Sequence, residues 1–267
     1  FRAKVLEGTA SAIEMLSVTG GEDASLAIMT TDSRPKRTVR ARDGWTIGGM
    51  AKGAGMLAPG LATMLVVITT DAVVDAPTLD AALREATRVS FDRLDSDGCM
   101  STNDQVTLLA SGATGITPGL ADFAAELRAV CLDLAEQLQS DAEGASHDIT
   151  IVVEGAASEA DAVEVGRSVA RNNLFKAAIF GNDPNWGRVL AAIGTTDAEF
   201  DPYNVDVWMN GVRVCSEGGP DAPREEVDLT PRATRLVIDL KVGAATATIL
   251  TNDLTHDYVH ENSAYAS

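Results

Sequence analysis

The chain has 267 residues, of which 45% are hydrophobic, a composition that excludes a disordered protein and allows one large domain or two smaller ones. Its formal net charge of −18 disfavours nucleic acid and membrane surfaces as partners, because phosphate groups are bound by clustered lysines and arginines. The three cysteines have no zinc-binding spacing, and the longest apolar run, residues 64–69, is too short to span a bilayer. We therefore expect a cytoplasmic protein with reduced thiols and no metal.

In the first half of the chain, short apolar runs alternate with amphipathic segments. Residues 25–32 and 62–72 are apolar runs bounded by turn residues, and we predict a buried strand at each. Residues 77–94 carry apolar side chains at helical spacing, and residues 117–138 do so more clearly, with Thr117 placed to cap the helix. Two amphipathic helices and two strands are therefore expected here.

The second half favours a strand, a helix and two hairpins. Residues 149–157 are typical of a buried strand, and Ser158 is a candidate cap for a helix over residues 158–173. The Asn-Gly pair at 210–211 is a strong hairpin signal, and we predict a second hairpin about residues 242–243. These elements indicate a mixed, layered α/β fold better than a series of βαβ units. A subdomain boundary is expected near residues 197–202.

The most informative local feature is Thr63, which follows a glycine-rich turn and begins an apolar strand. One interpretation is a threonine chosen for its strand propensity. The other is a nucleophile: if the bond between Ala62 and Thr63 is cut, the freed α-amine of Thr63 can act as its base, since such an amine titrates near pH 8. The small, flexible flank before Thr63 suits such self-cleavage. The pattern alone leaves both interpretations open.

Other polar clusters also admit two interpretations. Lys52 lies among glycines, where it could hold a carboxylate or be a solvated loop residue, and no nucleotide P-loop motif follows it. The acidic run 92–104 lacks the glutamate of a calcium loop and indicates a turn. His256 and His260 are four residues apart without a zinc-binding motif, and residues 181–192 form a turn-rich loop whose role is either structural or site-building.

Taken together, several strings resemble the ornithine acetyltransferases (glutamate N-acetyltransferases) of arginine biosynthesis, in the family's order and over essentially the whole chain. The matching strings are AIMTTDSRPK (27–36), IGGMAKGAGMLAP (47–59), ATML (62–65), TTDA (69–72), DGCMSTND (97–104), DAEGASHD (141–148), NDPNWGRVLAA (182–192) and ENSAYAS (261–267). The run over residues 52–71 and the string NDPNWGR are highly specific. The resemblance implies an α/β/β/α sandwich with a smaller C-terminal region.

The resemblance also implies a reaction. The precursor cuts itself between Ala62 and Thr63, so residues 1–62 belong to an α chain and residues 63–267 form a β chain. Thr63 then takes the acetyl group from N2-acetyl-L-ornithine and passes it to L-glutamate, without a metal or bound cofactor; some members also accept acetyl-CoA as donor. The substrate-binding positions that it implies are Thr30, Lys52, Thr63, Glu143, Asn262 and Ser267. Lys52 can pair with a substrate carboxylate and Glu143 with the ornithine ammonium, so the two residues supply the positive and the negative charge that a site for both substrates needs.

The resemblance further implies that the two fragments stay associated, as a heterotetramer with two copies of each. The family's oxyanion donors are a Thr-Gly pair in an upstream segment, and Thr19-Gly20 lies too close to Thr30 to be that pair. We therefore expect that the chain lacks an N-terminal segment that carries them. The alternative function is an amidase or aminopeptidase of the same self-cleaving fold, in which water resolves the acyl-enzyme. A second alternative is a scaffold protein that no longer cuts itself.

Overall fold

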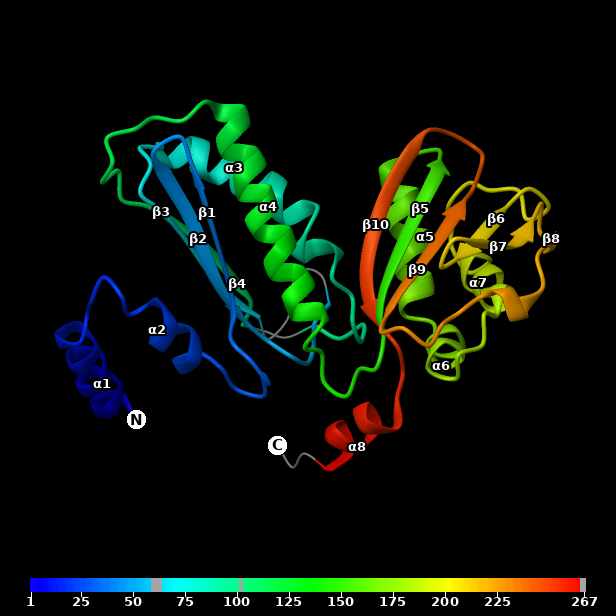
Figure 1. The fold of residues 1–267 in the computed structure, drawn as a ribbon, viewed down its shortest axis with the longest axis horizontal. Helices are drawn as coiled ribbons and strands as arrows, with labels where there is room; N and C mark the ends of the chain where they lie inside the picture. The colour runs from blue at the N-terminus through cyan, green and yellow to red at the C-terminus, as the bar shows by residue number, and fades with distance from the viewer. Residues whose placement is uncertain (59–63, 101–102, 265–267) are drawn as a thin grey trace.

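The computed structural model describes residues 1–58, 64–100 and 103–264, and two β-sheets with flanking helices make up this part of the chain (Figure 1). The sheets have the strand orders β1-β2-β3-β4 and β10-β5-β9-β6-β7-β8. The strands are β1 (Lys36–Arg42), β2 (Trp45–Lys52), β3 (Leu65–Thr70), β4 (Gln105–Ala110), β5 (Asp148–Ala156), β6 (Asp206–Met209), β7 (Val212–Ser216), β8 (Gly219–Pro220), β9 (Ala233–Asp239) and β10 (Ala245–Asn252). The helices are α1 (Arg2–Glu14), α2 (Gly21–Ala27), α3 (Ala76–Arg88), α4 (Leu120–Gln139), α5 (Glu159–Ala170), α6 (Asn173–Phe180), α7 (Trp186–Ile193) and α8 (His256–Ala264), with short 3-10 turns at Phe91–Arg93 and Arg224–Glu226. The predicted layered α/β class is confirmed.

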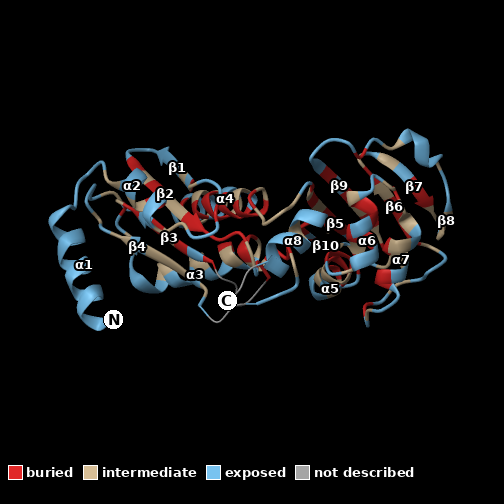
Figure 2. Ribbon diagram, turned by 90° about the horizontal axis from the view of Figure 1, so that it is seen from below, coloured by how far each residue is buried: buried red, intermediate tan, exposed pale blue. Residues whose placement is uncertain are grey.

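The four-stranded sheet buries one face against helix α4, while part of the other face is exposed and α2 borders the rest. Its buried core includes Ile68, and Figure 2 shows the buried stretches along α4 and the strands beside it. A Cβ on Gly49 would lie 3.1 Å from the side chain of Leu134, so a glycine lets α4 approach β2 closely. On the opposite face Val39 and Leu109 are 71% and 54% exposed. They lie in one row across the sheet, because the strand register pairs Val39 with Gly48, then Thr69, then Leu109.

The six-stranded sheet is built around β5, which runs parallel to β9 and antiparallel to β10. Helix α5 packs against β5 and β10, and its predicted cap is confirmed: the Ser158 hydroxyl accepts a hydrogen bond from the Asp161 N–H at 3.1 Å. The hairpin at Asn210 and Gly211 is also confirmed, since both residues adopt the positive φ that a two-residue turn between β6 and β7 requires.

Two predictions in the first half were wrong. Residues 25–32 do not form a strand; helix α2 ends within them, with Glu22 and Asp23 in its first turn, where acidic side chains favour a helix. Thr117 does not cap α4, because the helix begins at Leu120 after an extended Gly119. Both errors come from assigning structure by local apolarity and cap type, without knowing which neighbours the segment contacts.

The predicted second hairpin is also wrong. Strands β9 and β10 are not neighbours, since β5 lies between them. The connection passes over the end of β5, where the N–H groups of Val242 and Gly243 donate to the Gly155 carbonyl at 2.8 and 2.9 Å. A Cβ on Gly243 would lie 2.2 Å from the Ala156 carbonyl oxygen, so only glycine permits this close crossing. In the described part of the chain, none of the helices is both long and apolar enough to cross a membrane.

Candidate active site

At one end of the four-stranded sheet, along what we call here its edge, β2 ends and β3 and β4 begin. The register places Lys52 opposite Leu65, and Leu65 beside Gln105. The Met64 N–H donates to the Asp104 carboxylate at 2.8 Å, which fixes the backbone directly after Thr63 in the sequence. Lys52 is buried at this edge. A lysine and a carboxylate therefore flank the start of β3.

Partial burial determines how easily the Asp104 carboxylate at this edge is protonated. Burial raises the pKa of Asp104, and the Met64 N–H and the charge of Lys52 offset only part of that effect. The carboxylate is therefore easier to protonate than an exposed aspartate. Sequence reasoning missed Asp104, although it stands in one of the strings that carry the family resemblance.

Glu143 lies over the glycine-rich loop that follows β2. Its backbone N–H donates to the Ala54 carbonyl at 2.9 Å. A Cβ on Gly55 would lie 2.5 Å from a Glu143 carboxylate oxygen, so the absence of a side chain at Gly55 makes room for the acid. The Asn262 amide approaches the same carboxylate at 3.5 Å. The structure therefore brings Glu143 and Asn262 together.

Helix α8 carries Asn262 and is held against the segment that carries Glu143. The Thr255 hydroxyl donates to the Gly144 carbonyl at 2.5 Å and accepts from the Tyr258 N–H at 2.9 Å. Gly144 has φ +63°, and a Cβ there would lie 2.2 Å from the Tyr258 nitrogen. Burial, together with the negative charges of nearby groups that include Glu143, raises the pKa of the Tyr258 hydroxyl to about 12. Tyr258 is therefore neutral at physiological pH.

Thr30 lies in an exposed turn, and the Asp32 carboxylate connects this turn to the loop that follows β2. The Thr30 N–H donates to the Asp32 carboxylate at 3.1 Å, and the Gly53 N–H donates to the other oxygen of that carboxylate at 2.7 Å. Burial raises the pKa of Asp32, but hydrogen bonds from Gly53, Lys36 and Thr30 outweigh it and hold the pKa below its ordinary value. A cavity of about 640 Å³ lies alongside, lined by Thr31, Glu143 and the start of α8.

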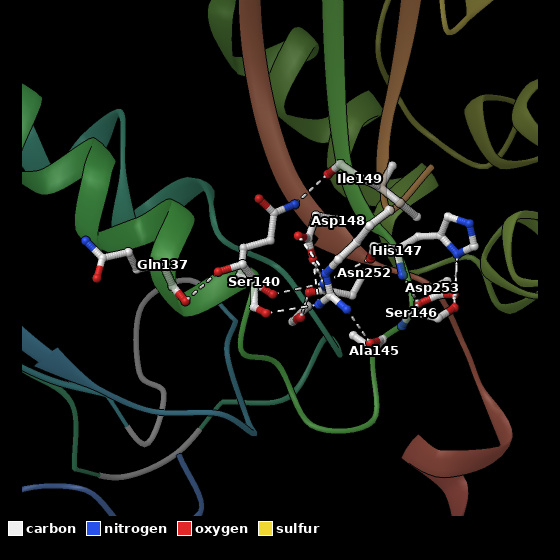
Figure 3. Close-up of polar contacts among 12 residues, drawn as sticks. Gln137, Ser140, Ala145, Ser146, His147, Asp148, Ile149, Asn252 and Asp253 are labelled. Atoms are coloured by element: carbon white, nitrogen blue, oxygen red, sulfur yellow. Dashed lines mark hydrogen bonds and ion pairs between the residues drawn. The ribbon is translucent and has the colours of Figure 1, made fainter. Parts of the chain in front are cut away.

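A polar network fixes the ends of the segment between α4 and β5 (Figure 3). Glu143 belongs to this segment. The Gln139 amide donates to the carbonyls of Ile149 and Thr251 at 2.9 and 2.8 Å. The Asn252 amide donates in return to the carbonyls of Gln139 and His147 at 3.0 and 3.1 Å (Figure 3). Because these amides are buried and satisfied, the network joins the end of α4 to β5 and β10 in one defined arrangement.

Ser146, His147 and Asp253 meet in the same region, but they do not form a nucleophilic triad (Figure 3). His147 Nδ1 lies 2.8 Å from Asp253 and 3.0 Å from the Ser146 hydroxyl, so one ring nitrogen faces both partners. His147 Nε2 lies 2.9 Å from the Leu229 carbonyl. A triad needs the nucleophile and the orienting carboxylate on opposite nitrogens of the imidazole. The cluster instead anchors the start of α8.

Three predicted site residues, Ala62, Thr63 and Ser267, lie outside the described residues. Within the described ranges, no cluster of three or more metal-ligating His, Cys, Asp or Glu side chains occurs. The cysteines Cys99, Cys131 and Cys215 are free.

Comparison with known proteins gives one consistent result. The model of the ArgJ family matches residues 2–267. The chain is 63% identical to the arginine biosynthesis bifunctional protein ArgJ of Streptomyces avermitilis and 58% identical to that of Thermobifida fusca; each match covers 99% of this chain and 69% of the relative. The crystal structure of arginine biosynthesis bifunctional protein ArgJ from Bacillus halodurans matches with a TM-score of 0.70 at 33% identity, over 75% of this chain and 98% of that one.

Proposed function

Because the chain belongs to the ArgJ family, we propose that it is an acetyltransferase of arginine biosynthesis, which moves an acetyl group from N2-acetyl-L-ornithine to L-glutamate through Thr63. The observation that carries the proposal is that Lys52 and Asp104 lie at the start of β3, while the pair of Glu143 and Asn262 is joined to the loop after Lys52 by the bond from the Glu143 N–H to the Ala54 carbonyl. A cation at Lys52 and an anion at Glu143 support a site for substrates that carry both signs of charge, and Lys52 lies opposite Leu65, two residues after Thr63 in the sequence.

The chemistry begins with cleavage between Ala62 and Thr63, which divides the chain into residues 1–62 and 63–267. The freed α-amine of Thr63 accepts the hydroxyl proton, and the oxygen attacks the acetyl carbonyl of acetylornithine. The C–N bond then breaks, the proton passes to the leaving nitrogen, and ornithine departs from an acetyl-threonine. In the second half-reaction the neutral amine of glutamate attacks the ester, and Thr63 recovers its hydroxyl.

The binding roles follow from charge. Glu143 pairs with the side-chain ammonium of acetylornithine, and Lys52 pairs with a substrate carboxylate. Thr30, Asn262 and the C-terminal residue Ser267 complete the polar contacts to either substrate. No bound cofactor takes part, and the two fragments remain associated in the cytoplasm, as a heterotetramer with two copies of each.

A steady-state transfer assay tests the function. The full protein, including the upstream segment expected to carry the oxyanion donors, is incubated with acetylornithine and glutamate, and acetylglutamate and free acetate are both quantified. We expect acetylglutamate to form and Thr63→Ala to abolish its formation, while Thr69→Ala, a matched exposed strand threonine, leaves the rate within twofold of the parent. Release of acetate without acetylglutamate would indicate an amidase and contradict the proposal, and so would activity that survives Thr63→Ala.

A further inference from the structure

Lys36 is fully buried at the first position of β1, between two aspartates. Its ammonium lies 2.6 Å from a carboxylate oxygen of Asp32 and 2.6 Å from one of Asp141. Asp32 and Asp141 come from segments about a hundred residues apart in the sequence and are themselves buried. We call Asp32, Lys36 and Asp141 the buried ion cluster.

Each carboxylate of the buried ion cluster also holds a backbone segment. Asp32 accepts the N–H groups of Thr30 and of Gly53, the residue after Lys52. Asp141, two residues before Glu143, accepts the N–H of Ser33 at 3.0 Å, and the Ser33 hydroxyl donates to its other oxygen. The cluster therefore ties together the three segments that carry Thr30, Lys52 and Glu143.

Stability alone does not account for this arrangement. Two carboxylates and one ammonium leave a net negative charge in the interior, and buried ion pairs are often no more stabilising than apolar side chains of the same volume. Such a cluster does fix the position of the backbone, because each hydrogen bond to a charged oxygen holds one N–H group at a defined distance. One fixed group belongs to Thr30 itself, Gly53 directly follows Lys52, and Asp141 lies two residues before Glu143.

We infer that Asp32, Lys36 and Asp141 are positioning residues, whose buried ion cluster sets the spacing between Thr30, Lys52 and Glu143 and so determines the affinity for both amino-acid substrates. This inference rests on the proposed function. It assigns no substrate contact to the cluster itself. Small errors in the placement of binding groups lower enzyme efficiency by up to about a hundredfold, so weakening one bond in the cluster is expected to be measurable in KM.

The test compares Asp141→Asn with Asp206→Asn in the full protein. Asp206 is a matched control: it is buried, its carboxylate lies 2.8 Å from Lys241 and accepts the Glu217 N–H, and it stands in the six-stranded sheet. We expect Asp141→Asn to raise the KM for acetylornithine and for glutamate by about tenfold, with kcat changed less than threefold. Asp206→Asn should lower the melting temperature comparably and leave both KM values within twofold of the parent.

A purely structural role gives a different result. If Asp141→Asn is folded and both KM values stay within twofold of the parent, the positioning role is refuted. If it does not fold, Ser33→Ala takes its place, since that change removes only the hydroxyl bond to Asp141; we expect at least a threefold rise in both KM values, and no rise refutes the inference. A parent protein without acetyl transfer would instead contradict the proposed function, so the two failures are distinguishable.

Discussion

Replacing Glu143 by glutamine tests the assignment of the ornithine ammonium to this carboxylate. In the described part of the chain, no lysine, arginine or histidine nitrogen lies within 4 Å of the Glu143 carboxylate, which accepts a hydrogen bond from the Asn262 amide at 3.5 Å. The carboxylate charge is thus not neutralised by a side chain and is available to a substrate. Glutamine keeps the shape and an acceptor oxygen but removes the charge.

The expected magnitude follows from the bond that is lost. A hydrogen bond to a charged group contributes about 1.5–3 kcal/mol, which corresponds to about 10- to 150-fold in kcat/KM. In a ping-pong reaction, kcat/KM for the donor reports only the first half-reaction. We therefore expect Glu143→Gln to lower kcat/KM for acetylornithine by that factor. The value for glutamate should be unchanged or higher, because a negative group that repels its side chain has been removed.

The assay is steady-state transfer with each substrate varied in turn, for the parent, Glu143→Gln and Glu154→Gln. Glu154 is an exposed acid on β5 and serves as the control, with both values expected to stay within twofold of the parent. An equal fall for both substrates in Glu143→Gln would show that the substitution damages the site generally. An unchanged value for acetylornithine would refute the charge assignment.

Three further predictions concern packing, thiol reactivity and pH. Gly55→Ala should lower kcat/KM for acetylornithine at least tenfold in the transfer assay, because the added Cβ would meet the Glu143 carboxylate at 2.5 Å and displace it. In the native protein at pH 8, iodoacetamide should label Cys99, which is exposed, and leave Cys131 unlabelled in peptide mass spectra, because burial raises the pKa of the Cys131 thiol to about 12. The pKa of Asp32 lies below its ordinary value, so the unfolded chain binds more protons than the folded one. The stability that this carboxylate contributes is therefore lost as the pH falls below about 4. The difference in urea midpoint between the parent and Asp32→Asn should shrink as the pH is lowered from 6 to 3.5.

Each of these predictions has a matched control. Gly8→Ala adds a Cβ with no atom within 4 Å and should leave kcat/KM unchanged; a fall of similar size there would contradict the packing explanation. Cys215 is buried with a raised pKa and should also stay unlabelled, so labelling of either buried thiol before Cys99 would be the opposite of the expected order. Thr69→Ala changes an exposed side chain that does not titrate, and its midpoint difference from the parent should not vary with pH.

Local signals in the sequence were sufficient where a structure depends on adjacent residues. The Ser158 cap and the Asn210–Gly211 turn were predicted correctly because one side chain or one backbone conformation decides each of them. The second hairpin failed because two strands with a short connection need not pair. The glycine that permits the crossing over β5 contacts Ala156, which is 87 residues away in the sequence, and no local pattern reveals that contact.

The site residues, too, divide into those that the sequence indicated and those that only the fold brings together. The resemblance to a known family supplied Lys52, Glu143 and Asn262, and the structure places the last two in contact. Lys36 and Asp141 also stand in the matching strings, but the resemblance implied no site role for them. Local sequence indicated no role either, because a lysine near a strand start and an aspartate after a helix are ordinarily solvated. Only the fold brings the Lys36 ammonium to 2.6 Å from Asp141 and buries both groups.

The intact mass of the full protein, before and after incubation with acetylornithine, tests the central claim most directly. We expect two fragments, the second beginning at Thr63, and an added acetyl group on that fragment which glutamate removes. A single uncut mass without an acetyl adduct would contradict it, because Thr63 would then have neither a free amine to act as base nor a role as the acetyl carrier.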